Sequence, residues 1–507
     1  MEITSVAFYV FVGISLLIYW KLPHKYQWLL LLVDSLLFYF ANSTYYTFIY
    51  IIISVISVYY VTNYFRKEEK ASNKKKLLVL TIILNIGILV VLKYTNLFIN
   101  TFNFLGSKVL NVEGISNVKW LAPLAISYYT LQMVSYLLDC YWEMAEPFSN
   151  PLKLLLYCIY FPLMVSGPIC RYSEIGEELF NYHAFSYDRT KRGLYRIAWG
   201  LMKKLTISNR LAIIVNQMWN NPITSTGINV WISMALFVFQ LYTDFSGCMD
   251  IVIGVSNCFG INPPENFNAP LLSKSTQEFW QRWHITLGSW FRDYVMSPLL
   301  KSKKFNSFSR WCKAKFGKTG KKIPAYIASL VVWIGIGIWH GNSWKYVLMG
   351  FWFWFIITIS QILNPTYKTI INKLKINVDS ILWKIFQVIR TFVTYMFGAI
   401  LFRADSISDA FIRIKNSFNV NFSLQFLKDI RLAVRFDDVS SYYGLVAIAV
   451  GLILVFIIDY LKYKEEDYIK KLVNSKWYVR WTIYYLIAIL LITSLDITNQ
   501  EILYAQF

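Results

Sequence analysis

Long apolar windows recur from one end of the 507-residue chain to the other, separated by short polar connections. The first two occupy residues 7–20 and 28–40. A membrane-spanning helix needs roughly 20 mostly apolar residues, and on that criterion we count about 11–13 candidate spans. The pattern predicts an all-α, polytopic integral membrane protein.

The apolar windows follow one another without a Pro/Ser-rich linker or a repeat of fixed period, so we expect a single domain over residues 1–507. It divides into N-terminal helices (1–118), a core (119–350) and C-terminal helices (351–507). The first apolar run lacks a small-residue cleavage site behind it and is interpreted as a retained helix. The core contains residues 261–322, where the pattern of spans breaks down.

Composition agrees with a membrane protein, because 56% of the residues are hydrophobic and only 16% are charged. The net charge of +21 comes from Lys and Arg in connections such as 66–76 and 301–322. The positive-inside rule places such loops in the cytoplasm. This distribution favours contact with anionic lipid headgroups over nucleic acid. The six cysteines show no CxxC pair and are interpreted as buried small side chains, without disulfide or zinc.

The central segment carries a helix-start signal, because Ser275 precedes Glu278 by three residues in a capping-box pattern. If one helix runs on to residue 295, its polar face comprises Arg282, Thr286, Ser289 and Asp293, and its adjacent apolar face Trp283, Leu287, Trp290 and Tyr294. A charged residue at mid-bilayer costs several kcal/mol, so this helix lies at an interface or lines an enclosed cavity. An interfacial helix with a purely structural His284 remains an alternative.

His340 ends another apolar run, "IGIGIWHGNSW" (334–344), in which Gly335, Gly337 and Gly341 allow a backbone or a ligand to approach closely. An ionisable group in such a segment is a functional candidate. His284 and His340 are each preceded by tryptophan. Imidazole can act as a general base on a hydroxyl, and the chain has no GxSxG nucleophile elbow. Direct transfer to a hydroxyl is therefore the simplest chemistry.

Residues 242–295 and 337–350 resemble the membrane-bound O-acyltransferase family, within it the bacterial branch of the alginate O-acetyltransferase membrane subunit. Supporting segments lie at 91–99, 121–143, 161–172 and 401–411, so the resemblance covers nearly the whole chain. It implies membrane helices, with additional interfacial or re-entrant helices, around a central tunnel. In that tunnel a cytoplasmic acyl thioester meets an acceptor that reaches in from the outer side.

The resemblance implies that His340 is the catalytic histidine and that His284 is the second histidine of the motif. Further substrate or tunnel candidates are Trp339, Asn342, Trp283, Arg282, Ser289, Asp293, Asp244 and Ser246. For the polar ones among them we favour a structural role, because buried polar groups need partners. Which acid, if any, orients His340 is left open.

Two positions depart from the branch. "VMSPLLKSKKFNS" (295–307) replaces a Pro-Leu-Gly-Gly-Asn stretch, which puts in doubt how that loop meets the donor, and Cys248 stands where tyrosine is common.

The expected function is that of an O-acyltransferase, above all an O-acetyltransferase, in the cytoplasmic membrane of a bacterium. It would take an acyl group from a thioester, either acetyl-CoA or a carrier-protein thioester, towards an exported cell-envelope polysaccharide. No bound cofactor or metal is expected. The resemblance implies a separate extracytoplasmic partner of the SGNH type that finishes the transfer, and association with the polysaccharide or its synthase.

Three alternatives stay open. The first is D-alanyl transfer from a carrier protein to teichoic acid, against which the segments at 91–99 and 401–411 argue. The second is a transporter or channel with a histidine proton relay, although the chain shows no internal repeat. The third is a catalytically silent scaffold for an envelope synthase.

Overall fold

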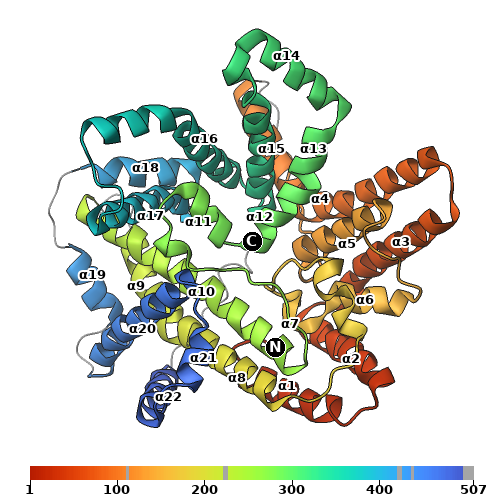
Figure 1. Ribbon diagram of the computed structural model, residues 1–507, viewed down its shortest axis with the longest axis horizontal. Helices are drawn as coiled ribbons and strands as arrows, with labels where there is room; N and C mark the ends of the chain where they lie inside the picture. The colour runs from red at the N-terminus through yellow and green to blue at the C-terminus, as the bar shows by residue number, and fades with distance from the viewer. Residues whose placement is uncertain (110–113, 221–225, 420–424, 435–438, 495–507) are drawn as a thin grey trace. The chain divides into compact units, whose positions relative to one another are not determined.

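The regular structure of the chain is helical. The computed structural model describes residues 1–109, 114–220, 226–419, 425–434 and 439–494, and within them a single isolated antiparallel bridge, between Phe267 and Trp283, accompanies the helices (Figure 1). Residues 495–507, the end of the expected C-terminal part, lie outside the described residues. The predicted all-α class is confirmed.

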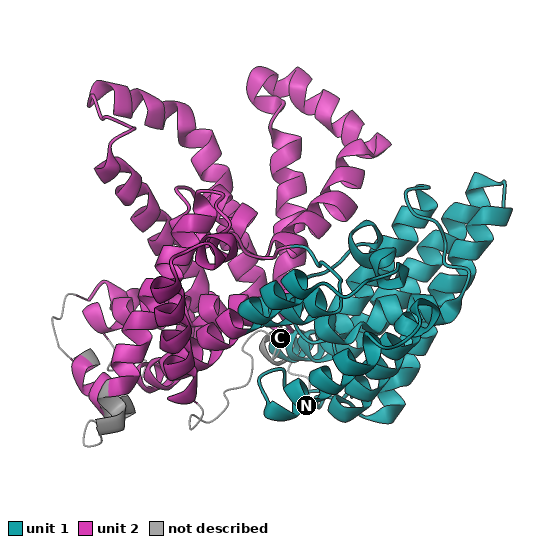
Figure 2. Ribbon diagram, turned by 60° about the horizontal axis from the view of Figure 1, so that its bottom comes forward, with its two compact units in different colours: residues 1–197, 248–264 teal, residues 198–247, 265–507 magenta. Residues whose placement is uncertain are grey.

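The helices gather into two compact units (Figure 2). Unit 1 contains residues 1–197 and 248–264, and unit 2 contains residues 198–247 and 265–507. The chain passes from one unit to the other three times: within α8 (Tyr187–Leu201), within α10 (Ile228–Cys258) and between Pro264 and Glu265. The expectation of one domain over the whole chain stays a prediction.

Unit 1 is built from long helices followed by shorter ones. Ser5 caps the first of them, since its Oγ accepts a bond from the Phe8 N–H at 3.2 Å. The helices are α1 (Val6–Tyr19), α2 (His24–Asn42), α3 (Phe48–Lys67), α4 (Ala71–Val109), α5 (Ile126–Tyr141), α6 (Pro151–Ile159), α7 (Phe161–Met164) and most of α8, with short turns at Tyr45–Thr47, Tyr172–Gly176 and Glu178–Phe180.

Unit 2 begins with the last residues of α8, which a π-helical segment, Met202–Ser208, continues. Its other elements are α9 (Asn209–Trp219), the first part of α10, a 3₁₀ turn (Pro270–Leu272), α11 (Thr276–Arg282), α12 (Ile285–Phe291), a π-helical segment (Arg292–Met296), α13 (Ser297–Lys301), α14 (Lys303–Gly320), α15 (Ile323–His340), α16 (Trp344–Lys373), α17 (Ile381–Arg403), α18 (Ile407–Ser417), α19 (Gln425–Val434), α20 (Val439–Tyr463), α21 (Tyr468–Val473) and α22 (Trp477–Ile492).

Seven helical segments of the described chain are long and apolar enough to cross a membrane: Tyr45–Lys67, Ala71–Gly106, Ile228–Cys258, Ile323–His340, Trp344–Lys373, Ile381–Arg403 and Tyr443–Tyr463. Two shorter apolar helices are α1 and α22. The number is below the expected range because apolar windows such as 119–168 fold into the shorter helices α5, α6 and α7. The protein is a multi-pass membrane protein.

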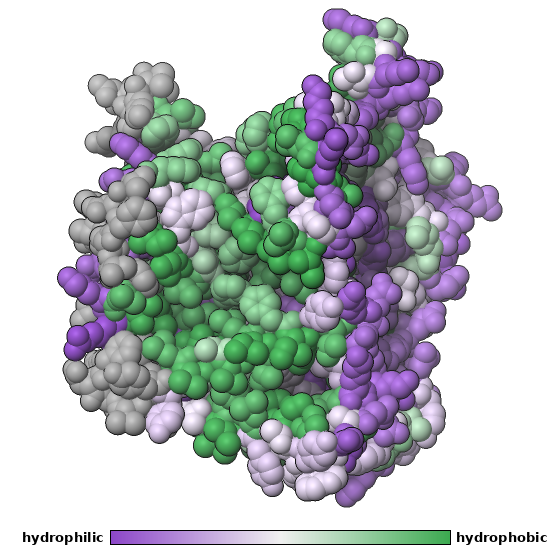
Figure 3. All heavy atoms as spheres, turned by 60° about the vertical axis from the view of Figure 1, so that its left-hand side comes forward, coloured by the Kyte–Doolittle hydropathy of each residue, from purple (hydrophilic) through white to green (hydrophobic). Residues whose placement is uncertain are grey.

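The seven segments differ in burial. In α10, 89% of the most apolar window is buried, against 28–44% in the other six. The remaining segments expose large apolar side chains, for example Ile381 and Leu382 on α17, which are 74% and 76% exposed. Figure 3 shows a broad apolar area on one face, with hydrophilic residues along its border. Such an area suits contact with lipid.

The basic stretch 301–322, expected as a connecting loop, is mostly helical. Ser302 caps α14 by accepting a bond from the Phe305 N–H at 3.3 Å, and α15 begins three residues after α14 ends. The stretch holds nine Lys or Arg and no acidic residue. Its cytoplasmic placement, and that of residues 66–76, stay predictions.

Candidate active site

The central segment starts its helix where the sequence predicts. Ser275 Oγ accepts a bond from the Glu278 N–H at 3.1 Å, and α11 begins at the next residue. The Glu278 carboxylate accepts from the Lys274 N–H at 2.8 Å, so the two side chains together satisfy two backbone donors ahead of the helix.

The helix does not run on to residue 295, however. It ends at Arg282, Trp283 is extended, and His284 has left-handed backbone angles of φ 46° and ψ 52° before α12 starts. The cause is a pairing with an upstream segment: the Asn268 N–H donates to the Arg282 carbonyl at 3.0 Å and the Ile285 N–H to the Asn266 carbonyl at 3.1 Å. These bonds replace helical ones. The predicted single polar face of Arg282, Thr286, Ser289 and Asp293 is therefore wrong.

Asn266 fixes the ring of His284. Its Oδ1 accepts from the Thr286 N–H at 3.1 Å and from the Thr286 hydroxyl at 3.0 Å, and lies 3.2 Å from His284 Nδ1. Because a backbone N–H can only donate, this atom is the amide oxygen. Nδ1 therefore carries the proton, and Nε2 is the basic nitrogen of the neutral ring.

His284 is 2% exposed. Burial, followed by the neighbouring His340, lowers the pKa of His284 well below its usual range. Removing a charged ring from water is unfavourable, so the imidazole is neutral near pH 7. The structure thus gives His284 a fixed tautomer and a fixed charge.

His340 is the last residue of α15 and is 3% exposed. The ring of Trp339 lies beside both histidines, with centroid distances of 5.7 Å to His284 and 5.1 Å to His340. His340 also meets the ring of Phe402 edge-on at 5.7 Å, and His284 meets that of Phe245 at 4.9 Å. The structure brings together the two histidines singled out in the sequence, 56 residues apart in the chain.

Two cavities of unit 2 adjoin the histidines. A large one of about 510 Å³ is lined by His284, Leu287, Ser289 and Arg292 on one side, and by α15 and α16 on the other. A small one of about 20 Å³ is lined by His340. Trp280 and Trp283 line both cavities. The two indole rings therefore form the wall between a wide chamber at His284 and a narrow one at His340.

Other predicted candidates line these cavities or lie away from them. Trp283 and Ser289 line the large cavity, and Trp339 is buried between the histidines. Asn342 is exposed. Asp293 forms an ion pair with Arg292 at 2.9 Å, with side chains 34% and 65% exposed. Exposed pairs of this kind contribute little to stability.

Arg282, Asp244 and Ser246 make structural contacts. Arg282 bonds the Glu278 carboxylate at 3.0 Å and the Asn268 carbonyl at 3.1 Å. Asp244 pairs with Lys204 at 2.5 Å, both side chains at most 2% exposed.

The remaining bonds of this group join α10 to the π-helical segment before α9. The Ser208 hydroxyl donates to Asp244 at 3.1 Å, and Ser246 accepts from Lys203 Nζ at 2.8 Å. Buried charges need such partners. The contacts support the structural role favoured for these polar residues.

The space beside the glycines around His340 is filled by other parts of the same chain. A Cβ on Gly337 would overlap the Tyr346 backbone, and one on Gly341 would overlap the Tyr346 ring. Gly335 faces the ring of Phe291 in the same way. The glycines therefore let α15 pack closely on α16 and α12.

Sequence reasoning missed two residues of the site, Asn266 and Phe402. Asn266 precedes His284 by 18 residues and shares no helical period with it, so no local pattern reveals the contact. Phe402 lies within the segment 401–411, which supports the resemblance without singling this residue out, and it reaches the site from α17.

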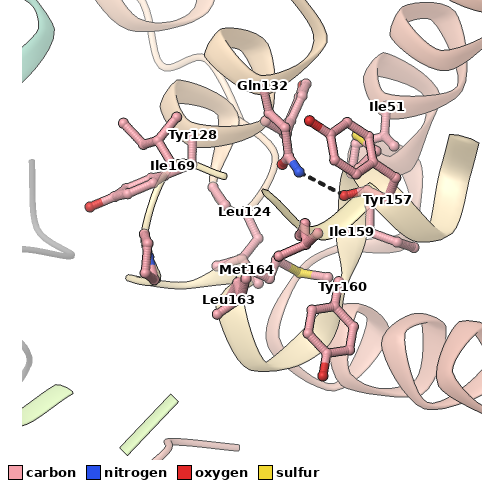
Figure 4. A pocket seen from close by; sticks show the side chains of 15 residues that line it. Ile51, Leu124, Tyr128, Gln132, Tyr157, Ile159, Tyr160, Leu163, Met164 and Ile169 are labelled. Carbon is pink, nitrogen blue, oxygen red and sulfur yellow. Dashed lines mark hydrogen bonds between the residues drawn. The ribbon is translucent and has the colours of Figure 1, made fainter. Parts of the chain in front are cut away.

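Unit 1 has a cavity of its own, shown in Figure 4. It has a volume of about 20 Å³ and is lined by tyrosines and aliphatic side chains of α3, α5, α6 and α7. Gln132 Nε2 donates to the Tyr157 carbonyl at 2.9 Å within it. None of the predicted site residues lines this cavity.

All six cysteines are buried, which confirms that part of their interpretation from the sequence. Among the described residues, no group of three His, Cys, Asp or Glu side chains is placed to hold a metal ion.

Known proteins resemble this chain in sequence. The model of the membrane-bound O-acyltransferase family matches residues 146–312, which include His284 and precede His340. A probable alginate O-acetylase of Azotobacter vinelandii is 26% identical over 407 residues, 80% of this chain and 76% of that protein. The peptidoglycan O-acetyltransferase of Helicobacter pylori is 28% identical over 370 residues, covering 68% and 64%. The teichoic acid D-alanyltransferase of Bacillus subtilis is 29% identical over 259 residues, covering 48% and 61%.

A multi-pass helical protein with two buried histidines beside cavities, and with these relatives, is an integral membrane acyltransferase. The match over residues 146–312 and the alginate O-acetylase relatives support the membrane-bound O-acyltransferase family and, within it, the alginate O-acetylase branch. Its reaction is acyl transfer to a hydroxyl.

Proposed function

We propose that the protein takes an acetyl group from acetyl-CoA and passes it to an alcohol for O-acetylation of an exported cell-envelope polysaccharide. The observation that carries this proposal is the pair of buried histidines joined by Trp339, with a wide chamber at His284 and a narrow one at His340. The wide chamber has room for the thioester arm of a donor. The narrow chamber places a small group beside a base.

In this scheme His340 is the general base. It removes the proton of the acceptor hydroxyl while the oxygen attacks the thioester carbonyl. The new C–O bond forms, the C–S bond breaks, and the departing thiolate takes the proton back from the imidazolium. The histidine ends the cycle as it began, and no acyl-enzyme is needed.

His284 has a positioning role in the proposal. Asn266 holds its Nδ1–H, which points Nε2 away from that bond, and the low pKa keeps the ring uncharged. The neutral, oriented ring of His284 lies beside Trp339, which also lies beside His340. It therefore helps to fix the position of the Trp339 ring next to the base. It adds no second positive charge when His340 is protonated during the reaction.

The relatives support a proposal for the acceptor and the setting. Those named as alginate O-acetylases and a peptidoglycan O-acetyltransferase modify polysaccharides, and we infer a polysaccharide acceptor here as well. We further propose that the protein resides in the cytoplasmic membrane of a bacterium. There, an extracytoplasmic SGNH-type partner completes the transfer to the polymer. The protein also associates with the exported polysaccharide or its synthase.

D-alanyl transfer is the competing proposal, because a teichoic acid D-alanyltransferase is among the relatives. Its D-alanyl group carries an ammonium, whereas the small cavity at His340 is lined by apolar and aromatic side chains without an acidic one. An unpaired buried charge is costly. The lining therefore favours acetyl over D-alanyl.

The test is thiol release from labelled acetyl-CoA by the purified protein in nanodiscs. We expect the wild type to release CoA and His340→Ala to lose about two orders of magnitude or more. Release from a D-alanyl carrier protein alone would replace acetyl-CoA as donor. Equal rates for wild type and His340→Ala would remove His340 from the chemistry.

A further inference from the structure

We propose that the small cavity beside His340 fixes the length of the transferred acyl group at two carbons. The inference rests on the proposed function and adds to it the residues that set acyl specificity. The cavity has a volume of about 20 Å³. A single water needs about 10–15 Å³ on the same measure, so the space fits one methyl-sized group and no longer chain.

The walls of this chamber come from five places in unit 2. They are Leu241 of α10, Trp280 and Trp283 at α11, His340 at the end of α15, Met349 and Phe353 of α16, and Tyr395, Gly398, Ala399 and Phe402 of α17. Its lining side chains carry few polar atoms: the ring nitrogens of His340, the Tyr395 hydroxyl and the indole N–H groups of Trp280 and Trp283, with no carboxylate, ammonium or guanidinium among them. A methyl group is therefore better suited to the space than a polar or charged substituent.

The rings of the chamber brace one another, which makes its size resistant to change. Phe353 packs against Trp280 at a centroid distance of 4.7 Å and against Tyr395 at 5.8 Å. Tyr395 in turn packs against Phe279 at 4.2 Å. Well-packed interiors do not expand freely for an added methylene. A longer acyl chain would have to displace several rings together.

The two small residues of α17 support this interpretation. A Cβ on Gly398 would overlap the Phe353 ring, so the glycine allows that ring to close the chamber. Ala399 is 3% exposed and lines the same space. Their sizes set how much room remains beside His340.

The wide chamber has a different shape and a different task. At about 510 Å³ it is some 25 times larger than the narrow one, and it is lined by Gln277, Gln281, Ser289 and Arg292 as well as apolar groups. Length selection therefore operates on the side of Trp280 and Trp283 that faces His340. The walls of the narrow chamber do not restrict the size of the donor's thiol-bearing arm.

The experiment compares acetyl-, propionyl- and butyryl-CoA as donors for the full-length protein in nanodiscs, by thiol release. One methylene in a fitted apolar pocket is worth about 10–200-fold in specificity. We expect the wild type to lose about tenfold or more from acetyl to propionyl and more again to butyryl. Equal rates with all three donors would overturn the inference and leave the acyltransferase proposal standing.

Variants test whether the walls of the small chamber set the preference for acetyl. Met349→Ala enlarges the chamber and should raise the propionyl-to-acetyl ratio about tenfold or more. Met218→Ala is the matched control, because Met218 is an equally buried methionine of unit 2, 3% exposed, outside the chamber. Its ratio should stay at the wild-type value. An unchanged ratio in Met349→Ala overturns the inference.

A second variant works in the opposite direction and does not depend on a new cavity. Ala399→Val fills the chamber from α17 and should lower acetyl turnover while leaving the preference for acetyl over propionyl intact or stronger. Faster propionyl transfer by this variant would contradict the inference. A wild type inert with every CoA donor overturns the proposed donor, and the length inference with it.

Discussion

The two histidines are held by opposite means. His284 occupies a break between helices, with its ring fixed by a hydrogen bond that its Nδ1–H donates to Asn266 Oδ1 and its backbone in the left-handed region. His340 ends a regular helix and is surrounded by the rings of Trp339 and Phe402. Hydrogen bonds define the first ring's tautomer, and packing defines the second ring's space. The difference suggests a division of labour in which one histidine is oriented and the other is placed against a small substrate group.

The largest effect expected on acyl transfer is that of removing His340. His340→Ala should lower thiol release by about 10²–10⁴-fold, and added imidazole should restore part of it, because the truncation enlarges the cavity already present. His284→Ala should respond less to imidazole, since its ring is held by Asn266. Steady-state rates with and without imidazole measure this. Equal rescue of both variants would abolish the distinction between the two histidines.

Asn266→Ala should have the next largest effect. The change leaves the Thr286 N–H and hydroxyl without their shared acceptor in a buried site, which costs about 1–3 kcal/mol in the free energy of unfolding. It also frees the His284 ring, so thiol release should fall about tenfold or more. Asn268→Ala is the control, because that side chain is exposed. Wild-type activity in Asn266→Ala would show that the orientation of His284 does not matter.

The acidity of His284 gives a smaller, pH-dependent effect. Its pKa is lowered in the folded protein, so the unfolded chain binds more protons below the ordinary value of about 6.5, and stability should fall as the pH falls through that value. His284→Asn removes the titrating ring and should flatten this part of the curve. Thermal unfolding of both proteins between about pH 7.5 and 5 tests it. Parallel curves would contradict the assigned direction.

The smallest effect on acyl transfer is expected from Asp244→Ala, although its effect on stability should be large. The substitution leaves Lys204 buried without its carboxylate partner, and breaking such a pair costs about 3–5 kcal/mol. Thiol release per folded molecule should stay within about twofold, because Asp244 lines neither cavity. A loss of turnover in fully folded protein would give Asp244 a place in the reaction.

The sequence predicts the parts of this picture that depend on local pattern. Apolar windows are enough for the all-α membrane class, and Ser275 marks the start of α11 to the residue. The break at His284 is different, because it is caused by pairing with residues 266–268, a contact that helical periodicity does not contain. Periodicity favours one long helix through "FWQRWHITLGSWFRDYV" (279–295), and the tertiary contact overrides it.

The histidines themselves were found by their setting, two ionisable groups in apolar surroundings, and by resemblance. Most of their partners, Asn266, Phe353 and Phe402 among them, were not. Trp280, Phe353 and Phe402 come from three different helices and meet only in space. The two-chamber arrangement can therefore be identified only from the structure, whereas the two histidines at its centre can be identified from the sequence.

The left-handed backbone at His284 has a consequence for any survey of substitutions in this protein. A β-branched or bulky replacement at position 284 would suffer a conformational penalty unrelated to acid–base chemistry, whereas asparagine and glycine tolerate those angles. A ranking of variants by activity at position 284 would therefore mix the backbone penalty with the loss of the imidazole. Position 340 lies in regular helix, so a ranking there would not include such a backbone penalty. Asparagine is accordingly the replacement that reports on the imidazole itself.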